Sequence, residues 1–275
     1  MYEDSDSAMG YGRVIMVKRE NKMIDAVFRF VSRLCVAFVA SILMFSQLSA
    51  AEGSPWSWGV GVVGSEDVYR DFNSRVIPVP LIIYRGDRLN LYGPYATYDV
   101  YRPGDVTASL ILSPVFAGYS EGDSPVFDGM DDRGYSMAGG VGVAYRPGQW
   151  HFSVNAIHDL LGVYSGYETA ARASYVIPAG SVFVEPGIGV EYQSRDYVDY
   201  YYGVTEAEAR SWRPAYAPAG STNPEISIAF FTRSLGGGTT RLQLTHTTYG
   251  KEISNSPLTD AEQSLGVNLS FGRMF

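Results

Sequence analysis

Hydrophobic and polar residues alternate with a period of two along most of the chain after residue 55. In residues 181–193, Val182, Val184, Ile188 and Val190 share one face, and the other face consists largely of Ser, Gly, Glu and Gln. Residues 135–145 and 264–275 alternate in the same way. Successive side chains of a strand point to opposite faces, so this pattern predicts strands. Helical periodicity is absent apart from a possible turn at residues 205–210.

The alternating segments and the turn residues between them predict twelve strands. These cover residues 56–65, 75–85, 88–94, 95–102, 105–117, 135–146, 149–159, 167–177, 181–193, 224–234, 240–249 and 262–275. With this count every tight turn falls at one end and the long segments 118–134, 194–223 and 250–261 fall at the other, as in bacterial outer-membrane barrels. The break at Gly93-Pro94 decides the count, and ten strands stay possible.

The two faces of these strands favour a closed, transmembrane antiparallel β-barrel, an all-β fold. A soluble β-sandwich also alternates, but here the second face is small and polar, as a narrow or wet lumen requires. Aromatic residues gather at predicted strand ends, among them Trp56, Tyr98, Tyr145, Trp150 and Tyr249. Such rings favour the membrane interface. Only a closed barrel satisfies the hydrogen-bonding groups of strands within lipid.

The first 51 residues differ from the rest. Residues 34–45 form an uncharged apolar run behind Arg29 and Arg33, and small residues follow up to Ala51. This order is typical of a secretory signal peptide, and the run falls short of the about 20 residues that span a membrane. We therefore expect a signal peptide at residues 23–51, an upstream extension at residues 1–22, and the barrel at residues 52–275.

Charge and cysteine content narrow the function classes. The 275 residues carry a net charge of −8, and charged residues make up 18%. Without the leader, 15 basic and 24 acidic residues remain, a net charge of −9. An acidic chain repels phosphate, which argues against nucleic acid as a partner. The only cysteine, Cys35, lies in the leader, so disulfides, thiol catalysis and cysteine-based metal sites are excluded from the barrel.

Several segments, in order, carry a resemblance to the MipA/OmpV family of outer-membrane proteins. They are Ile77–Asp87, Asp131–Gly139, Glu185–Tyr192, Tyr200–Arg210 and Ser256-Pro257-Leu258. The family pattern usually has Ser-Gly after the arginine of the fourth segment, whereas Ser211 is followed here by Trp212. This departure affects the expected local geometry of that loop. The resemblance covers essentially the whole chain after the leader.

The resemblance implies an outer-membrane location in a Gram-negative bacterium and a non-enzymatic role. The family's name-giving member looks like a structural scaffold that joins a lytic murein transglycosylase to a murein synthase. Other members are described as porin-like, as adhesins or as surface antigens. We therefore expect a scaffold for murein enzymes, with a small channel or a ligand-binding barrel as the alternative. Outer-membrane lipid and the barrel-assembly machinery are further expected partners.

Charged residues on the lumen-facing side of the predicted strands form one candidate site. They are Glu168, Arg172, Glu185, Glu191, Glu225 and Arg233. In a narrow barrel such charges pair and fill the interior. If they line water instead, the excess of carboxylates favours cations. The second candidate is the loop with Tyr200, Tyr201, Tyr202 and Gly203, which we expect to fold inward as a plug or to order the rim, because exposed tyrosines would leave an apolar patch.

Chemistry-bearing residues are few, and no catalytic, cofactor or metal site is expected. His158 and Asp159 are sequence neighbours and point to opposite faces of a strand, so they form no dyad. His151 shares the luminal face with Ser153 and Asn155, but on a single strand beside a tight turn. The acidic residues of segment 118–134 lack the spacing of an EF-hand and are expected to be solvated.

The C-terminal strand ends in an aromatic residue. Phe271 and Phe275 alternate with small polar residues on the last predicted strand. This pattern resembles the recognition signal for barrel assembly, and we expect Phe275 to promote membrane insertion.

Overall fold

The structure, a computed structural model, describes residues 54–72, 74–233 and 237–274. The predicted leader at 23–51, the upstream residues 1–22 and Phe275 lie outside the described residues. The strands are β1 (Trp56–Ser65), β2 (Arg75–Arg85), β3 (Leu89–Tyr92), β4 (Tyr95–Tyr101), β5 (Val106–Val115), β6 (Ser136–Tyr145), β7 (Trp150–Asp159), β8 (Tyr167–Tyr175), β9 (Ile177–Ala179), β10 (Val182–Gln193), β11 (Ser221–Thr232), β12 (Thr239–Thr248) and β13 (Gln263–Met274).

These strands form one closed antiparallel barrel. The last strand, β13, pairs with β1 from Ser57 opposite Met274 to Ser65 opposite Gly266, and β10 pairs with β11 over its whole length. β8 and β9 both pair with β10 and are interrupted only at Val176, so together they occupy one position in the wall. The wall therefore has twelve positions, which confirms the predicted fold and count.

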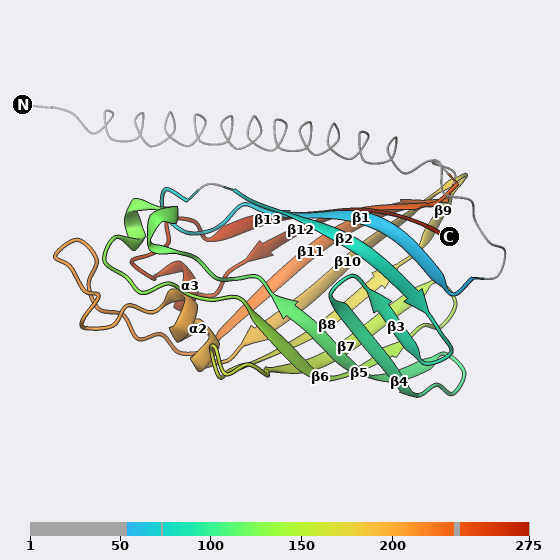
Figure 1. Ribbon diagram of the computed structural model, residues 1–275, viewed down its shortest axis with the longest axis horizontal. Coiled ribbons are helices and arrows are strands. Elements are labelled where there is room, and N and C mark those ends of the chain that lie inside the picture. Colours follow the sequence, from blue (N-terminus) through green and yellow to red (C-terminus); the bar gives the residue numbers. More distant parts are fainter. Residues whose placement is uncertain (1–53, 73, 234–236, 275) are drawn as a thin grey trace, which may run out of the picture. The chain divides into compact units, whose positions relative to one another are not determined.

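The predicted break between residues 88–94 and 95–102 is a turn at Gly93-Pro94. Gly93 has φ +58°, a left-handed conformation that suits glycine. Its N–H donates to the carbonyl of Ile82 at 3.0 Å, and a side chain there would meet Leu81. The chain therefore reverses part-way along β2, and β3 and β4 form a short hairpin (Figure 1).

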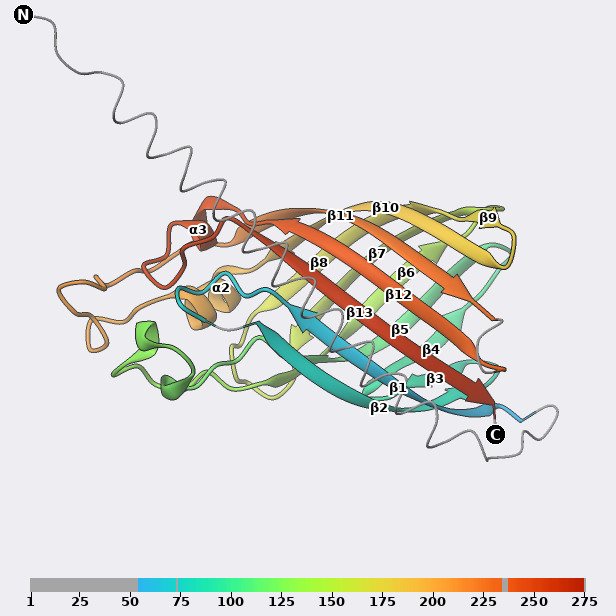
Figure 2. The same cartoon turned by 90° about the horizontal axis from the view of Figure 1, so that it is seen from above.

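The barrel has two contrasting ends. We call one the loop end; it consists of residues 66–72, 116–135, 160–166, 194–220 and 249–262. The opposite turn end consists of residues 86–88, 102–105, 146–149, 180–181, 233 and 237–238. Figures 1 and 2 show the long connections and the helices together at the loop end, away from the tight turns.

The loop end also holds the helices. They are η1 (Glu121–Asp123), η2 (Pro125–Phe127), α2 (Arg195–Tyr202) and α3 (Lys251–Ser254). The prediction that helices are absent is wrong for α2. Its eight residues are too few to show a helical period in a tyrosine-rich segment. Ser194 begins this helix and accepts a hydrogen bond from the Tyr197 N–H at 3.5 Å. No helix among the described residues is long and apolar enough to cross a membrane.

The predicted alternation sorts side chains to two faces of the wall. Val141, Val154, Ile188 and Ile226 lie on the outside and are all more than half exposed. Their neighbours in the chain turn inward and are mostly Gly, Ala, Ser, Asn or charged residues. β2 departs from this rule, because its inward residues Ile77, Val79, Leu81 and Ile83 are aliphatic. The largest hydrophobic core lies among the loops at the loop end.

Candidate functional site

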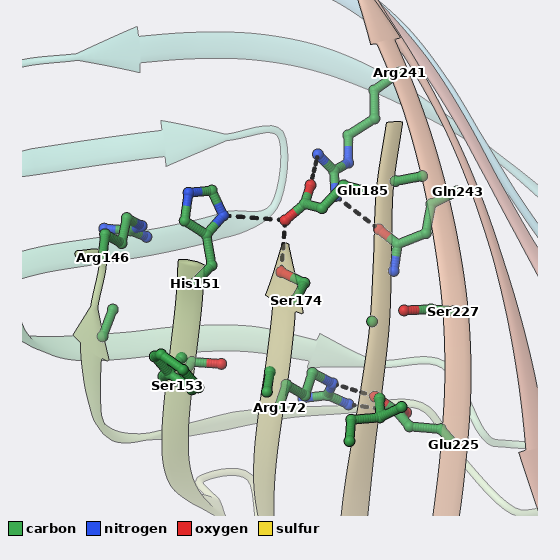
Figure 3. Close-up of a pocket in the computed structure, with 16 residues that line it drawn as sticks. Arg146, His151, Ser153, Arg172, Ser174, Glu185, Glu225, Ser227, Arg241 and Gln243 are labelled. Carbon is green, nitrogen blue, oxygen red and sulfur yellow. Dashed lines mark hydrogen bonds and ion pairs between the residues drawn. The ribbon is translucent and has the colours of Figure 1, made fainter. Parts of the chain in front are cut away.

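A polar cluster crosses the lumen near the turn end. At its centre is Glu185 of β10, whose Oε1 accepts a hydrogen bond from the Ser174 hydroxyl at 2.8 Å and lies 3.0 Å from Nδ1 of His151. Its Oε2 accepts from Nη1 of Arg241 at 3.0 Å (Figure 3). Arg241 also donates to Gln243 at 3.3 Å. Four strands, β7, β8, β10 and β12, thus meet at one carboxylate.

A second ion network lies farther from the turns. The guanidinium of Arg172 contacts both carboxylate oxygens of Glu225, with Nε–Oε1 at 2.5 Å and Nη2–Oε2 at 3.3 Å. Glu191 is 3.9 Å from the same guanidinium. This fork geometry links the neighbouring strands β8, β10 and β11 on the inner face of the wall.

The six predicted lumen residues therefore do not form one network. Arg172, Glu191 and Glu225 come together, and Glu185 has His151 and Arg241 as partners instead. Glu168 lies nearer the loop end and accepts from the Tyr164 hydroxyl at 3.2 Å. Arg233 is exposed at the turn end and forms no ion pair with any residue that the structure describes.

Arg241 is the member of the first network that sequence reasoning missed. It shares the inward parity of Gln243 and Thr245 on β12, so the alternation that identified the other residues could have identified it. Its cation changes the balance of the lumen, because it neutralises a carboxylate that was expected to attract cations.

Cavities follow the lumen from the turn end toward the loop end. Two of 530 and 470 Å³ lie near the turns, and their linings include Arg85, Arg102, Arg146, Arg233 and Arg241. A cavity of 250 Å³ surrounds the Glu185 cluster, and one of 180 Å³ lies directly below Tyr197 and Tyr202. The lumen therefore has room for water along much of its length, with arginines concentrated near the turns.

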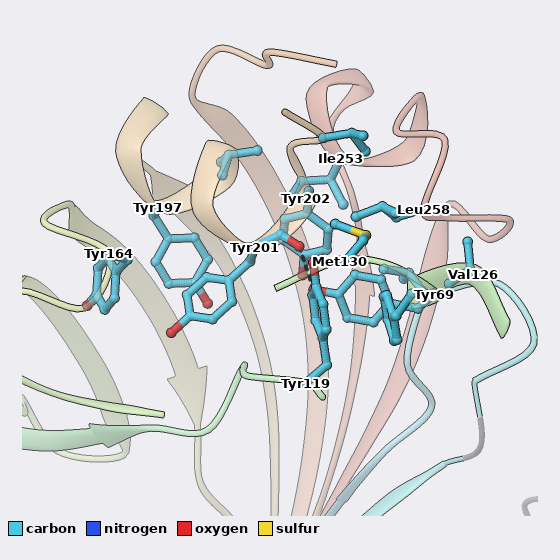
Figure 4. Close-up of a cluster of buried hydrophobic side chains, with 14 of the residues drawn as sticks. Tyr69, Tyr119, Val126, Met130, Tyr164, Tyr197, Tyr201, Tyr202, Ile253 and Leu258 are labelled. Carbon is cyan, nitrogen blue, oxygen red and sulfur yellow. Dashed lines mark hydrogen bonds between the residues drawn. The ribbon is translucent and has the colours of Figure 1, made fainter. Parts of the chain in front are cut away.

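The loop end is closed by a packed hydrophobic core, which we call the tyrosine plug. Its buried members are Val68, Tyr69, Val115, Tyr119, Val126, Phe127, Met130, Ala138, Tyr164, Tyr197, Val198, Tyr201, Tyr202, Val204, Ile253 and Leu258 (Figure 4). Tyr69 stacks on Tyr202 with ring centroids 5.3 Å apart, and Tyr119 stacks on Phe127 at 3.8 Å. Burial raises the pKa of Tyr69, Tyr197 and Tyr202 well above the usual value, so these hydroxyls stay protonated.

The predicted tyrosine segment lies in this plug. Tyr201 is fully buried and Tyr202 nearly so, while Tyr200 is partly exposed at the edge. The Tyr201 hydroxyl donates to the Gly134 carbonyl at 3.1 Å, and the Gly134 N–H donates to the Tyr200 hydroxyl at 3.0 Å. Gly203 follows as the C-cap of α2.

Two loops that lie far apart in the sequence supply hydrogen-bond donors to the last carbonyls of α2. The carbonyls of Tyr201 and Tyr202 are at the end of α2, where helical partners are lacking. Tyr69 donates its hydroxyl to the first at 3.0 Å, and Ser256 donates to the second at 2.6 Å. The serine-proline step at 256–257 is thus a contact that holds the plug together.

A buried carboxylate, Glu208, joins two loops of the plug. Its Oε1 accepts from Nη2 of Arg133 at 2.8 Å and from the Asp131 N–H at 3.1 Å. Its Oε2 accepts from the N–H and the hydroxyl of Thr205 at 3.0 and 2.9 Å. Burial alone would raise the pKa of Glu208, but these hydrogen bonds outweigh it and lower the pKa to about 2.

Arg213 is a second buried charge in the same place. Its side chain is fully buried, and its guanidinium donates to the carbonyls of Val126, Asp128 and Glu208. Burial lowers its pKa from the usual value. Sequence reasoning did not single out Glu208, Arg133 or Arg213 as a group, because their contacts span up to 87 residues of chain.

The remaining chemical candidates have structural contacts. The His151 imidazole lies 3.0 Å from Glu185, and among the described residues no hydrogen bond joins it to Ser153 or Asn155, as nucleophilic catalysis would require. His158 contacts the backbone carbonyl of Asp159. In the acidic loop, Glu121, Asp123 and Asp132 each accept a backbone N–H. No group of residues suited to hold a metal occurs in the described part of the chain.

Comparison with known proteins places the chain among outer-membrane proteins. The family described as MltA-interacting protein MipA matches residues 58–275. The MltA-interacting protein of Escherichia coli K12 is 30% identical over 215 residues, which cover 76% of this chain and 86% of that protein. The outer membrane protein OmpV of Vibrio cholerae is 26% identical over 208 residues, covering 75% and 81%.

Among solved structures, the NanC porin is similar with a TM-score of 0.44 at 6% identity, covering 79% of this chain and all of that chain. An outer membrane channel from Pseudomonas putida F1 gives a TM-score of 0.38 at 12% identity, covering 82% of this chain and 97% of that one.

The family match spans the barrel from β1 onward and includes the loops that form the plug. The relatives are named as outer-membrane proteins, and the strands have the exposed apolar face that lipid requires. In such barrels short turns face the periplasm and long loops face outward, so the turn end is periplasmic and the plug is external. The chain belongs to the MltA-interacting protein (MipA) family and is a β-barrel of the outer membrane.

Proposed function

We propose that this protein is an outer-membrane scaffold whose periplasmic end holds enzymes that cleave and synthesise murein. The observation that carries the proposal is the set of exposed arginines at the turn end: Arg85, Arg88, Arg102, Arg146 and Arg233. We call them the arginine rim. The described carboxylates at these turns are fewer, and Arg102 alone of the rim pairs with one, Asp99, at 3.5 Å. A basic ring on a barrel of acidic overall charge favours an acidic protein surface.

Tight turns by themselves offer a partner little surface. The cavities of 530 and 470 Å³ enlarge that surface, because they begin among the same arginines and lead inward. A partner segment that enters this mouth would reach Arg241 and His151 beside Glu185. The name of the Escherichia coli relative, MltA-interacting protein, supports a murein enzyme as the partner.

The test is co-purification from an envelope extract. The tagged barrel is expected to retain a lytic murein transglycosylase and a murein synthase, and the variant R85E/R88E/R146E is expected to lose most of both. R195E/K251E is the matched control, because Arg195 and Lys251 are exposed at the opposite end. Equal recovery with the rim variant and the wild type would exclude the arginine rim as the docking surface.

A second candidate function is a channel that the tyrosine plug holds closed. The specific observation is the series of cavities along the lumen, which ends below Tyr197 and Tyr202. Planar-bilayer recording separates the two functions. Conductance steps in the wild-type barrel, without retention of murein enzymes, would favour the channel.

We also propose that the last strand carries the assembly signal. Phe271 of β13 packs edge-to-face near Trp58 of β1, with ring centroids 5.9 Å apart, and Phe275 lies outside the described residues. Deletion of Phe275 is expected to lower the yield of heat-modifiable barrel in the membrane, because the assembly machinery would no longer recognise the strand. An unchanged yield would reject this role.

A further inference from the structure

Three cavities meet in the turn-end half of the lumen, and each pair of them shares one arginine. Arg85 of β2 lines the cavities of 470 and 530 Å³. Arg146, which follows β6, lines those of 530 and 250 Å³. Arg241 of β12 lines those of 250 and 470 Å³. Since β2, β6 and β12 are well separated in the strand order, a molecule where the cavities join would meet guanidinium groups from three sides of the wall.

Two of these three arginines have no partner. The guanidinium groups of Arg85 and Arg146 form no hydrogen bond or ion pair with another residue that the structure describes. Figure 3 shows His151 between Arg146 and Glu185, so this carboxylate serves His151 and Arg241 instead. A guanidinium carries N–H donors in a planar fork that matches a carboxylate. The lumen therefore presents two free forks to an anionic ligand.

Acidic side chains are scarce around the two larger cavities. The lining of the 470 Å³ cavity contains no Asp or Glu among the described residues, and its charged members are Arg85, Arg233, Arg241 and Arg273. The 530 Å³ cavity has one carboxylate, Asp99, which already accepts from the Ser109 hydroxyl at 2.7 Å and pairs with Arg102 at 3.5 Å. Walls that carry one sign of charge focus the field inside a cavity. This part of the lumen therefore attracts anions, although the whole chain is acidic.

The uncharged lining of these cavities suits a sugar. Hydroxyl and amide groups line them, among them Ser57, Thr239 and Ser270 in one and Asn90, Thr107 and Asn155 in the other. Such groups donate and accept hydrogen bonds, as sugar hydroxyls do.

Aromatic rings add an apolar surface to the same walls. Tyr92 lines both cavities, and Phe231 lines the 470 Å³ cavity. Phe231 is held by a stack on Phe183, with ring centroids 4.8 Å apart, and the guanidinium of Arg241 lies 5.9 Å from its ring centre. An aromatic face of this kind packs against the C–H groups of a sugar ring. Arginines, hydroxyls and rings together fit a saccharide that carries carboxylates.

We propose that the turn-end half of the lumen binds an acidic saccharide, a soluble murein fragment, whose carboxylates are held by Arg85 and Arg146. Cavities of 470 and 530 Å³ are within the usual range for small-molecule sites. The tyrosine plug closes the loop end, so the ligand reaches the site from the periplasm. Murein is the carboxylate-bearing glycan of that compartment, and its choice as the source rests on the proposed function.

The test is calorimetric titration of the purified, detergent-solubilised barrel with N-acetylmuramoyl-L-alanyl-D-glutamate, a sugar peptide that carries carboxylates. Saturable binding is expected, and added salt should weaken it because salt screens the attraction between guanidinium and carboxylate groups. In R85Q/R146Q the Kd is expected to rise on the order of tenfold, because hydrogen bonds to charged groups are lost. Chitobiose, a neutral sugar, is expected to show no measurable binding.

R88Q is the matched control, because Arg88 is an exposed turn residue that lines neither of the two larger cavities. It should bind the muramyl peptide as the wild type does, and heat-modifiable migration verifies that both variants fold. Unchanged affinity in R85Q/R146Q, or equal binding of chitobiose, would overturn the proposal. Tighter binding of digalacturonate would overturn murein as the source. No enzyme is present in this titration, so a lack of binding would reject this site alone, whereas failure to retain murein enzymes would reject only the scaffold function.

Discussion

The two ends of this barrel are built by opposite means from the same strands. The outer end is sealed by a core of buried tyrosines, and the buried side chains of Glu208 and Arg213 hydrogen-bond to neighbouring loops. The periplasmic end has short turns, exposed arginines and cavities that lead inward. The twelve-stranded wall therefore does not determine whether either end of the barrel is open or closed. What closes one end is the length and composition of the loops, and where loops are short the lumen stays wet.

The strongest way to break this contrast is to remove the plug. Replacing residues 195–219 by a short glycine-serine linker deletes α2 and the carboxylate of Glu208 but no barrel strand. The cavities below Tyr197 and Tyr202 would then join the outside. We expect conductance steps in planar bilayers for this variant and a closed wild-type barrel. A variant that folds yet does not conduct would show that the ion networks of the lumen are themselves a barrier.

A smaller change removes the charge of Glu208, which links two loops of the plug through Arg133. In E208Q, Arg133 loses the negative charge of its buried partner, and removal of one partner from a buried pair costs about 3 to 5 kcal/mol. Hydrogen exchange of residues 116–135 and 194–220 is expected to accelerate accordingly. E206Q is the control, because Glu206 is exposed in the same loop. Equal exchange in the two variants would show that the tyrosines hold the loops without the ion pair.

Acid should weaken the same contact between Glu208 and Arg133 by protonating the Glu208 carboxylate. The pKa of Glu208 is about 2 in the folded protein, below its ordinary value of 4.5. A depressed carboxyl pKa stabilises the fold above the ordinary value, and this stabilisation is lost as the pH falls from about 4.5 through about 2. Loop exchange in the wild type should therefore rise in that window. E208Q should lack this component, and an identical acid response in both would assign it to other carboxylates.

The smallest effect on stability is expected near the turn end, where the lumen holds cavities. The side chain of Arg241 is 40% exposed, so its pair with Glu185 is screened by water. R241Q should lower the free energy of unfolding by no more than about 1 kcal/mol in urea titrations. R88Q, which alters an exposed turn residue, serves as the control. A loss near that expected for E208Q would mean that the lumen is drier than its cavities indicate.

The wall could be predicted from the sequence because its determinants are local. Alternation fixes which face each residue occupies, and Gly93-Pro94 decided the count of twelve through one turn. The same rule placed Glu185, Arg172 and Glu225 inside the barrel. Arg241 was accessible to this reasoning and was missed.

The plug could not be predicted in the same detail because its contacts are long-range. Arg213 hydrogen-bonds residues 85 and 87 positions away, and no periodicity connects them. The tyrosine segment pointed to an inward fold, yet α2 itself was not foreseen.

The caps of α2 carry a consequence for the order of assembly. Tyr69 lies between β1 and β2, and Ser256 lies between β12 and β13, so the two caps come from the first and last hairpins. Their loops also contact each other, since Arg70 donates to Leu258 and Asp260 donates to Val68. These loops become neighbours when β13 pairs with β1. The plug can therefore be completed only after the barrel has closed. A closed outer end indicates that β13 has paired with β1.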